Sequence, residues 1–119
     1  MKKNKFLQLD KKILTARGRQ ASERLEDGKV IPLTIKEVLI SLLPLADRKG
    51  RQAVTAWDLV LKIKNCKGSK MEFSDEEFGF IKKVVEENFR AKGANGEIVN
   101  YYLPFVTAQI LSEMEKQMR

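Results

Sequence analysis

The chain has 119 residues, a formal net charge of +7 and no histidine, and 43% of its residues are hydrophobic. This length is enough for one domain with a modest core, and the composition is typical of a soluble globular protein. Histidine is the commonest general acid/base near neutral pH and the commonest metal ligand, so its absence excludes most ordinary active sites and zinc sites. We therefore expect a non-catalytic protein that acts by binding, with no cofactor and no metal.

The single cysteine, Cys66, excludes an internal disulfide and suits a reducing cytoplasm. Nearby lysines favour its thiolate, but the chain has no histidine to act as a base, so we interpret Cys66 as a bystander thiol. The apolar runs are too short to cross a bilayer, and none follows the basic N-terminus as in a secretory signal. We expect a cytoplasmic protein, in the host cytoplasm if it is viral, with no membrane partner.

The positive charge is concentrated in two segments. Residues 1–24 and residues 48–70 each carry +6, whereas residues 25–47 carry −2 and residues 71–119 carry −3. Basic segments of this kind either track a phosphate backbone or keep a protein soluble, and charge alone does not separate the two roles. The candidate residues for nucleic-acid contact are Lys2, Lys3, Lys5, Lys11, Lys12, Arg17, Arg19, Arg24, Arg48, Lys49 and Arg51.

Residues 1–33 carry mixed structural signals. Phe6, Leu7 and Leu9 can form a short strand, for which residues 30–31 are a candidate partner. Residues 13–26 can instead form a short basic helix, or an arm without fixed structure. We therefore divide the chain into a basic N-terminal arm, residues 1–33, and a helical domain, residues 34–119.

The first helix is predicted over residues 35–43. Thr34 and Glu37 fit a capping box, apolar residues follow at helical spacing, and Pro44 ends the helix. The second is predicted from about residue 47 or 51 to residue 63. Its predicted buried stripe, which places the lone tryptophan in the core, consists of Ala53, Val54, Trp57, Val60 and Leu61.

The third helix begins with a second capping box, Ser74 to Glu77, and is predicted to end at Gly93. Residues 98–103 favour a strand, but Asn100 as an N-cap with Pro104 in the first turn favours a helix start. We predict a fourth helix over residues 101–117. The predicted fold is mainly α: a small four-helix bundle with a basic N-terminal segment that is partly extended or β.

The sequence bears on two functional classes, a helix-turn-helix and an enzyme with acidic residues. The first two helices could form a helix-turn-helix that offers Arg51 and Gln52 to bases, but their connection is longer than the usual turn. A winged variant would make residues 97–103 a strand. The acidic residues give no better enzyme, because Asp75, Glu76 and Glu77 are explained by helix capping, and no phosphate-binding glycine loop is present.

The order of these segments resembles small all-α phage and prophage accessory proteins of unknown function. The resemblance covers roughly residues 30–115 and lies in PLTIKEVL (32–39), DLVLKI (58–63), FSDEE (73–77), FIKK (80–83) and YLPFVTAQIL (102–111). It implies a small viral accessory protein, but it carries over no activity and no functional residue.

Three functions follow as hypotheses. The first is a phage-type accessory protein that acts by protein–protein contact or self-association, with spare apolar surface at Phe105, Leu111 and Met118. The second is a DNA- or RNA-binding accessory protein that uses residues 1–24 and 48–70. The third is an inhibitor of a host nucleic-acid enzyme, although the basic charge argues against mimicry of DNA.

Overall fold

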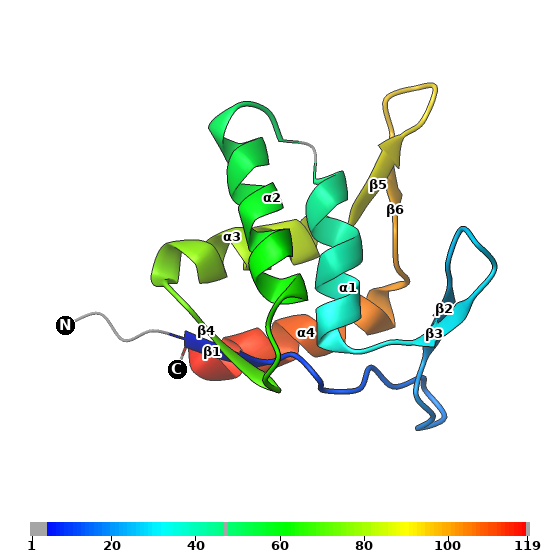
Figure 1. Cartoon of the computed structure of the whole chain (residues 1–119). Coiled ribbons are helices and arrows are strands. Elements are labelled where there is room, and N and C mark those ends of the chain that lie inside the picture. Colours follow the sequence, from blue (N-terminus) through cyan, green and yellow to red (C-terminus); the bar gives the residue numbers. More distant parts are fainter. Residues whose placement is uncertain (1–4, 47, 119) are drawn as a thin grey trace.

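The computed structural model describes residues 5–46 and 48–118 (Figure 1). Within these residues the chain forms four α-helices, a short 3-10 helix η1 (Leu43–Leu45) and six short strands. The helices are α1 (Ile35–Leu42), α2 (Arg51–Lys64), α3 (Asp75–Glu87) and α4 (Pro104–Gln117). The strands are β1 (Lys5–Gln8), β2 (Ser22–Arg24), β3 (Val30–Pro32), β4 (Lys70–Phe73), β5 (Phe89–Lys92) and β6 (Ile98–Asn100).

The predicted mainly α four-helix bundle is wrong, because the strands form three two-stranded antiparallel sheets: β1 with β4, β2 with β3, and β5 with β6. The β2–β3 and β5–β6 hairpins turn near Gly28 and Gly96, which have φ angles of 89° and 82°. Both glycines follow Asp or Asn, as is common in tight hairpin turns. The strands have only three or four residues, too few to show a clear alternation in sequence.

The elements pack with α1 and α2 side by side, α4 crossing below them, and α3 behind (Figure 1). The hairpins β2–β3 and β5–β6 project on one side, away from the β1–β4 ladder. One hydrophobic cluster joins these parts. Among its buried members are Leu7, Leu9 and Ile13 from the N-terminal segment and Leu39 and Ile81 from the helices.

The N-terminal segment is thus packed onto the helices over much of its described length. Residue Leu7 of β1 pairs with Met71 of β4, far along the chain. The expected pairing of the first strand with residues 30–31 is wrong, because β3 pairs with β2, and the predicted helix over residues 13–26 is not formed. The partner of a short strand is selected by which pairing buries its apolar face in the core. This selection depends on residues far along the chain, so the local sequence does not show it.

The predicted starts of α1 and α3 are confirmed. The Thr34 hydroxyl accepts a hydrogen bond from the Glu37 backbone N–H at 3.3 Å. At α3 the capping box is complete: the Ser74 hydroxyl accepts from the Glu77 N–H, and the Glu77 carboxylate accepts from the Ser74 N–H. Burial by itself would raise the pKa of Glu77. The hydrogen bonds that its carboxylate accepts from the Ser74 N–H and from Lys62 outweigh burial, so the pKa of Glu77 is lowered.

The predicted end of α3 is wrong, because the helix stops at Asn88 rather than Gly93. Asn88 adopts the left-handed conformation, with φ 46° and ψ 47°, and its backbone N–H donates to the Val84 carbonyl. Its side chain is buried: Nδ2 donates to the Tyr102 carbonyl at 2.6 Å, and Oδ1 accepts from the Tyr102 N–H at 2.9 Å. Asn tolerates this conformation better than most residues.

After Asn88 the chain continues directly into β5. The fourth helix therefore begins at Pro104, three residues later than predicted. Residues 98–100 form β6, so Asn100 is not the N-cap of α4. The N-cap is Leu103, with Pro104 at the first helical position, where its missing N–H costs nothing.

Replacing Asn88 tests this junction. Asn88→Gly keeps the left-handed backbone but removes two buried hydrogen bonds, so we expect it to lower the free energy of unfolding by about 2 kcal/mol. Asn88→Ala adds the backbone penalty, for a total of about 3 kcal/mol. Urea denaturation measures both. Equal, small losses below about 0.5 kcal/mol would show that Asn88 does not pin this junction.

Candidate functional site

Helix α2 carries apolar residues on two separate faces. The face that packs in the core consists of Ala56, Leu59, Val60 and Ile63. The predicted buried stripe is therefore wrong except at Val60: Val54, Trp57 and Leu61 are 47%, 56% and 40% exposed, and Ala53 is exposed as well. At 3.6 residues per turn these three side chains form one stripe along α2. The stripe points roughly 140° away from the direction of the buried face.

The apolar stripe of Val54, Trp57 and Leu61 adjoins the groove between α1 and α2. Trp57 contributes to two neighbouring hollows in this groove. The larger, of about 590 Å³, is lined by Ile40 and Pro44 on one side and by Val60 and Leu61 on the other, with charged residues at its rim. The smaller, of about 210 Å³, continues toward the start of α2 and is lined by Leu43, Pro44, Ala46, Arg48, Ala53 and Ala56 besides Trp57. We call this whole feature the α1–α2 groove.

Both ends of the α1–α2 groove are basic. Lys36, from the first turn of α1, donates to the Cys66 carbonyl at 3.1 Å, which shows that the start of α1 lies beside the end of α2. Lys36 and Lys64 line this end, together with Glu37. At the other end, Arg48 lines the smaller hollow and pairs with Glu87, and the exposed Lys49 follows Arg48 in the chain. An apolar centre between two basic ends is the main chemical character of this surface.

The predicted basic residues do not gather into one surface. Lys5 pairs with Asp75 at 2.5 Å, Lys11 pairs with Glu113, and Arg48 pairs with Glu87 at 2.6 Å. Lys2 and Lys3 lie outside the described residues. The exposed remainder is divided, because the loop that holds Arg17 and Arg19 lies at the opposite end of the molecule from the start of α2 (Figure 1). The remaining predicted residues, Lys12, Arg24, Lys49 and Arg51, are also exposed.

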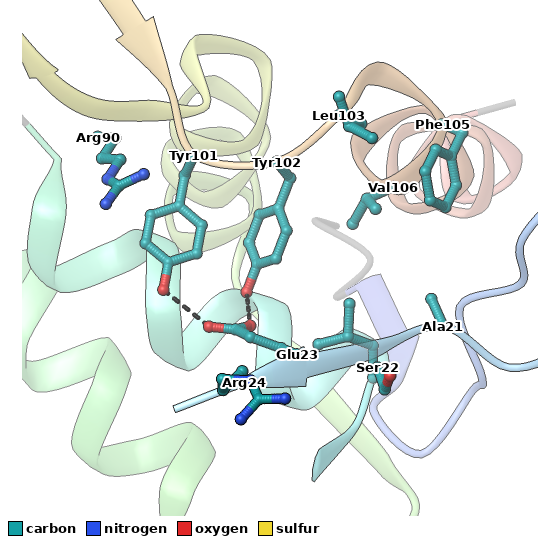
Figure 2. Close-up of a pocket in the computed structure, with 11 residues that line it drawn as sticks. Ala21, Ser22, Glu23, Arg24, Arg90, Tyr101, Tyr102, Leu103, Phe105 and Val106 are labelled. Carbon is teal, nitrogen blue, oxygen red and sulfur yellow. Dashed lines mark hydrogen bonds between the residues drawn. The ribbon is translucent and has the colours of Figure 1, made fainter. Parts of the chain in front are cut away.

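A second concave site lies between β2 and the start of α4 (Figure 2). Its volume is about 370 Å³. Glu23 accepts hydrogen bonds from the hydroxyls of Tyr101, at 2.7 Å, and Tyr102, at 2.5 Å. Figure 2 shows Leu103, Phe105 and Val106 on one side of the tyrosine pair and Arg90 on the other, with Arg24 next to Glu23. Both tyrosine hydroxyls donate to the one carboxylate of Glu23, so the contact clamps the β2–β3 hairpin to residues 101–102.

Burial, reinforced by the Glu23 carboxylate, raises the pKa of both tyrosines above their ordinary value, and most strongly that of Tyr102. Raised pKa values at a pocket can mark an active site. Here the geometry explains them fully, because each hydroxyl must stay protonated to donate to Glu23. We therefore assign the Glu23–Tyr101–Tyr102 clamp a structural role. Sequence analysis missed it, since the partners are separated by more than 70 residues.

Other predicted features have mixed outcomes. On α4, Phe105 and Met118 are exposed, whereas Leu111 packs against the core. Arg51 and Gln52 are exposed at the start of α2, but residues 43–50 separate α1 from α2 and include η1, which is longer than the turn of a helix-turn-helix. The strand of the winged variant exists as β6, in a hairpin that follows α3.

Across residues 5–46 and 48–118, acidic residues and Cys66 form no group of three or more that could hold a metal ion. Nor is any helix there long and apolar enough to cross a membrane.

Comparisons of this chain with known protein families, with curated proteins and with solved structures found no match. The resemblance to phage accessory proteins therefore stays a prediction.

The division of α2 into two apolar faces predicts unequal effects of substitution. Trp57→Ser should change the free energy of unfolding by less than about 0.5 kcal/mol, because the side chain is largely exposed. Leu59→Ala, on the buried face of the same helix, should cost about 2–4 kcal/mol. Denaturation of the two variants checks this assignment, and a larger loss for Trp57→Ser would place tryptophan in the core.

The clamp predicts a delayed titration of the tyrosines. Their folded pKa values are raised, so the stability from the clamp is complete below the unfolded pKa of about 10 and is lost as the pH rises through the folded values. Glu23→Gln removes the carboxylate charge, and phenolate absorbance should then appear at lower pH than in the wild-type protein. An unchanged absorbance titration would show that Glu23 does not hold the tyrosines.

Proposed function

We propose that this protein is a non-catalytic accessory protein whose α1–α2 groove docks onto a partner protein. One observation carries this proposal: Val54, Trp57 and Leu61 form an exposed apolar stripe on a helix whose core-facing positions are already filled by other residues. Contiguous exposed apolar side chains beside a hollow are typical of protein interfaces, and tryptophan is enriched among the residues that contribute most to binding.

The surface charges support a protein partner over a nucleic acid. Phosphate tracking needs a continuous basic path. Here three of the predicted cations are held in ion pairs, and the exposed ones are divided between two ends of the molecule. The apolar stripe also has Asp58 beside it on α2, a carboxylate that would repel phosphates. The nucleic-acid hypothesis is therefore the second candidate, and the test below includes it.

A displayed library of random peptides can test the groove without knowledge of the partner. Selection is made on the wild-type protein, and binding of the enriched peptides is then compared between two variants. Val54→Ser/Leu61→Ser removes part of the apolar stripe. Val30→Ser/Ile98→Ser is the matched control, because it removes two apolar side chains that are exposed to a similar degree, 57% and 53%, but lie on the hairpins.

We expect enriched peptides to bind the wild-type protein and the control alike, and to bind Val54→Ser/Leu61→Ser about 30-fold more weakly. This is the effect of two truncations of about 1 kcal/mol each. Peptides that bind both variants equally would contradict the proposal. The proposal would also be contradicted if the library gave no groove-dependent peptide while an oligonucleotide bound the protein and Arg51→Glu weakened that binding.

A further inference from the structure

We infer that the segment bound in the α1–α2 groove is an acidic amphipathic helix of a partner protein. This inference rests on the proposed function and specifies the occupant of the same groove. Three features carry it: the shape of the groove, the absence of backbone partners on its walls, and the charge at its two ends.

The shape suits a helix of about three turns. Along α2 the groove extends from Ala53 to Lys64, which is about 16 Å at 1.5 Å per residue. Trp57 contributes to both hollows, so the groove offers two adjoining places for apolar side chains. An amphipathic helix presents its apolar side chains at such intervals, at positions i, i+3 or i+4, and i+7.

The walls of the groove favour a helix over an extended peptide. One wall is α2, the other is α1 continued by η1 and residues 46 and 48, and among the described residues no strand residue lines either hollow. The interior backbone groups of α1 and α2 already bond within these helices. An extended segment laid in the groove would find no strand edge to pair with, and its own N–H and C=O groups would lose water without gaining partners. A helical segment satisfies its backbone internally.

The charge favours an acidic segment. Lys36 and Lys64 line one end of the groove, together with Glu37. At the other end Arg48 lines the smaller hollow and pairs with Glu87, and the exposed Lys49 follows Arg48 in the chain. A partner helix with carboxylates at both ends and apolar residues between them matches this pattern.

The same charges disfavour a second copy of this chain as the occupant. In an antiparallel pairing of two α2 helices centred on Trp57, Lys49 of each copy would face the Lys64 end of the other. In a parallel pairing, each cation would face its own counterpart. Both arrangements place like charges together, which costs free energy.

Synthetic peptides of 18 residues provide the test, with the chain's one tryptophan as the reporter. The first peptide carries leucines at helical spacing with glutamates at both ends and no tryptophan. The second has each glutamate replaced by lysine, and the third has a central proline that breaks the helix. The protein variant Lys49→Glu/Lys64→Glu reverses the charge at the two ends of the groove, and Lys29→Glu/Lys83→Glu is its control, with the same change in net charge at exposed positions elsewhere.

We expect the acidic peptide to shift Trp57 emission to shorter wavelength and to gain helical circular dichroism on binding. The lysine and proline peptides should bind at least tenfold more weakly. Lys49→Glu/Lys64→Glu should weaken binding of the acidic peptide about tenfold and strengthen binding of the lysine peptide, whereas the control should do neither. This exchange of preference is the signature of charge matched at the groove ends.

Several results would overturn the inference. Equal binding of the acidic and lysine peptides would contradict the claim that the bound segment is acidic. Equal binding of the acidic peptide and the proline peptide would contradict the claim that it is helical. If library peptides depend on the groove but are neutral or extended, the inference fails while the proposed function stands. If the acidic peptide does not bind while a single-stranded oligonucleotide shifts Trp57 emission, both fail. Concentration-dependent dimerisation that Val54→Ser/Leu61→Ser abolishes would instead identify a second copy as the occupant.

Discussion

The packing of α2 determines which surface this protein presents. The core accepts one face of the helix, through residues such as Leu59 and Ile63 that are almost fully buried. Helical geometry then leaves Val54, Trp57 and Leu61 turned away from that core, next to the groove that α2 forms with α1. The outer face of a surface helix is normally polar, so the second apolar face of α2 is unusual. The groove is thus a consequence of how the core is filled.

The remainder of the fold holds the groove-forming helices in place through a few long-range contacts. The β1–β4 ladder covers the core beside α4, so the N-terminal segment contributes buried residues such as Leu7 and Ile13. Asn88 ties the end of α3 to Tyr102, and Glu23 ties the β2–β3 hairpin to the same tyrosine and its neighbour. These contacts use polar groups with complete hydrogen bonding, which makes them specific as well as stabilising.

Local signals in the sequence predicted the starts of α1 and α3, because capping is decided within three or four residues, as at Ser74 and Glu77. They also predicted both ends of α1 and the end of α2 to within one residue, whereas the start of α2 was left open between residues 47 and 51. The face of α2 was not predictable in this way. Apolar residues at Val54, Trp57 and Leu61 and at Ala56, Leu59 and Ile63 form equally good helical stripes, and only the shape of the core selects one of them.

The sequence also could not show that its basic segments would be divided. The charges of Lys5, Lys11 and Arg48 are matched by acidic residues 39 to 102 positions away, so counts along the chain overstate the charge available to a ligand. The β1–β4 pairing and the Glu23–Tyr101–Tyr102 clamp are long-range in the same sense. The broad class of activity that we propose, a binding protein without catalytic equipment, was first suggested by the sequence and stays a prediction.

The most direct test of this account is a comparison of backbone amide chemical shifts with and without the acidic helical peptide. The account predicts that the largest changes lie in residues 36–44 and 51–64, along both walls of the α1–α2 groove. Changes centred on the pocket between β2 and α4, or on the loop that holds Arg17 and Arg19, would contradict it and would place binding on another surface.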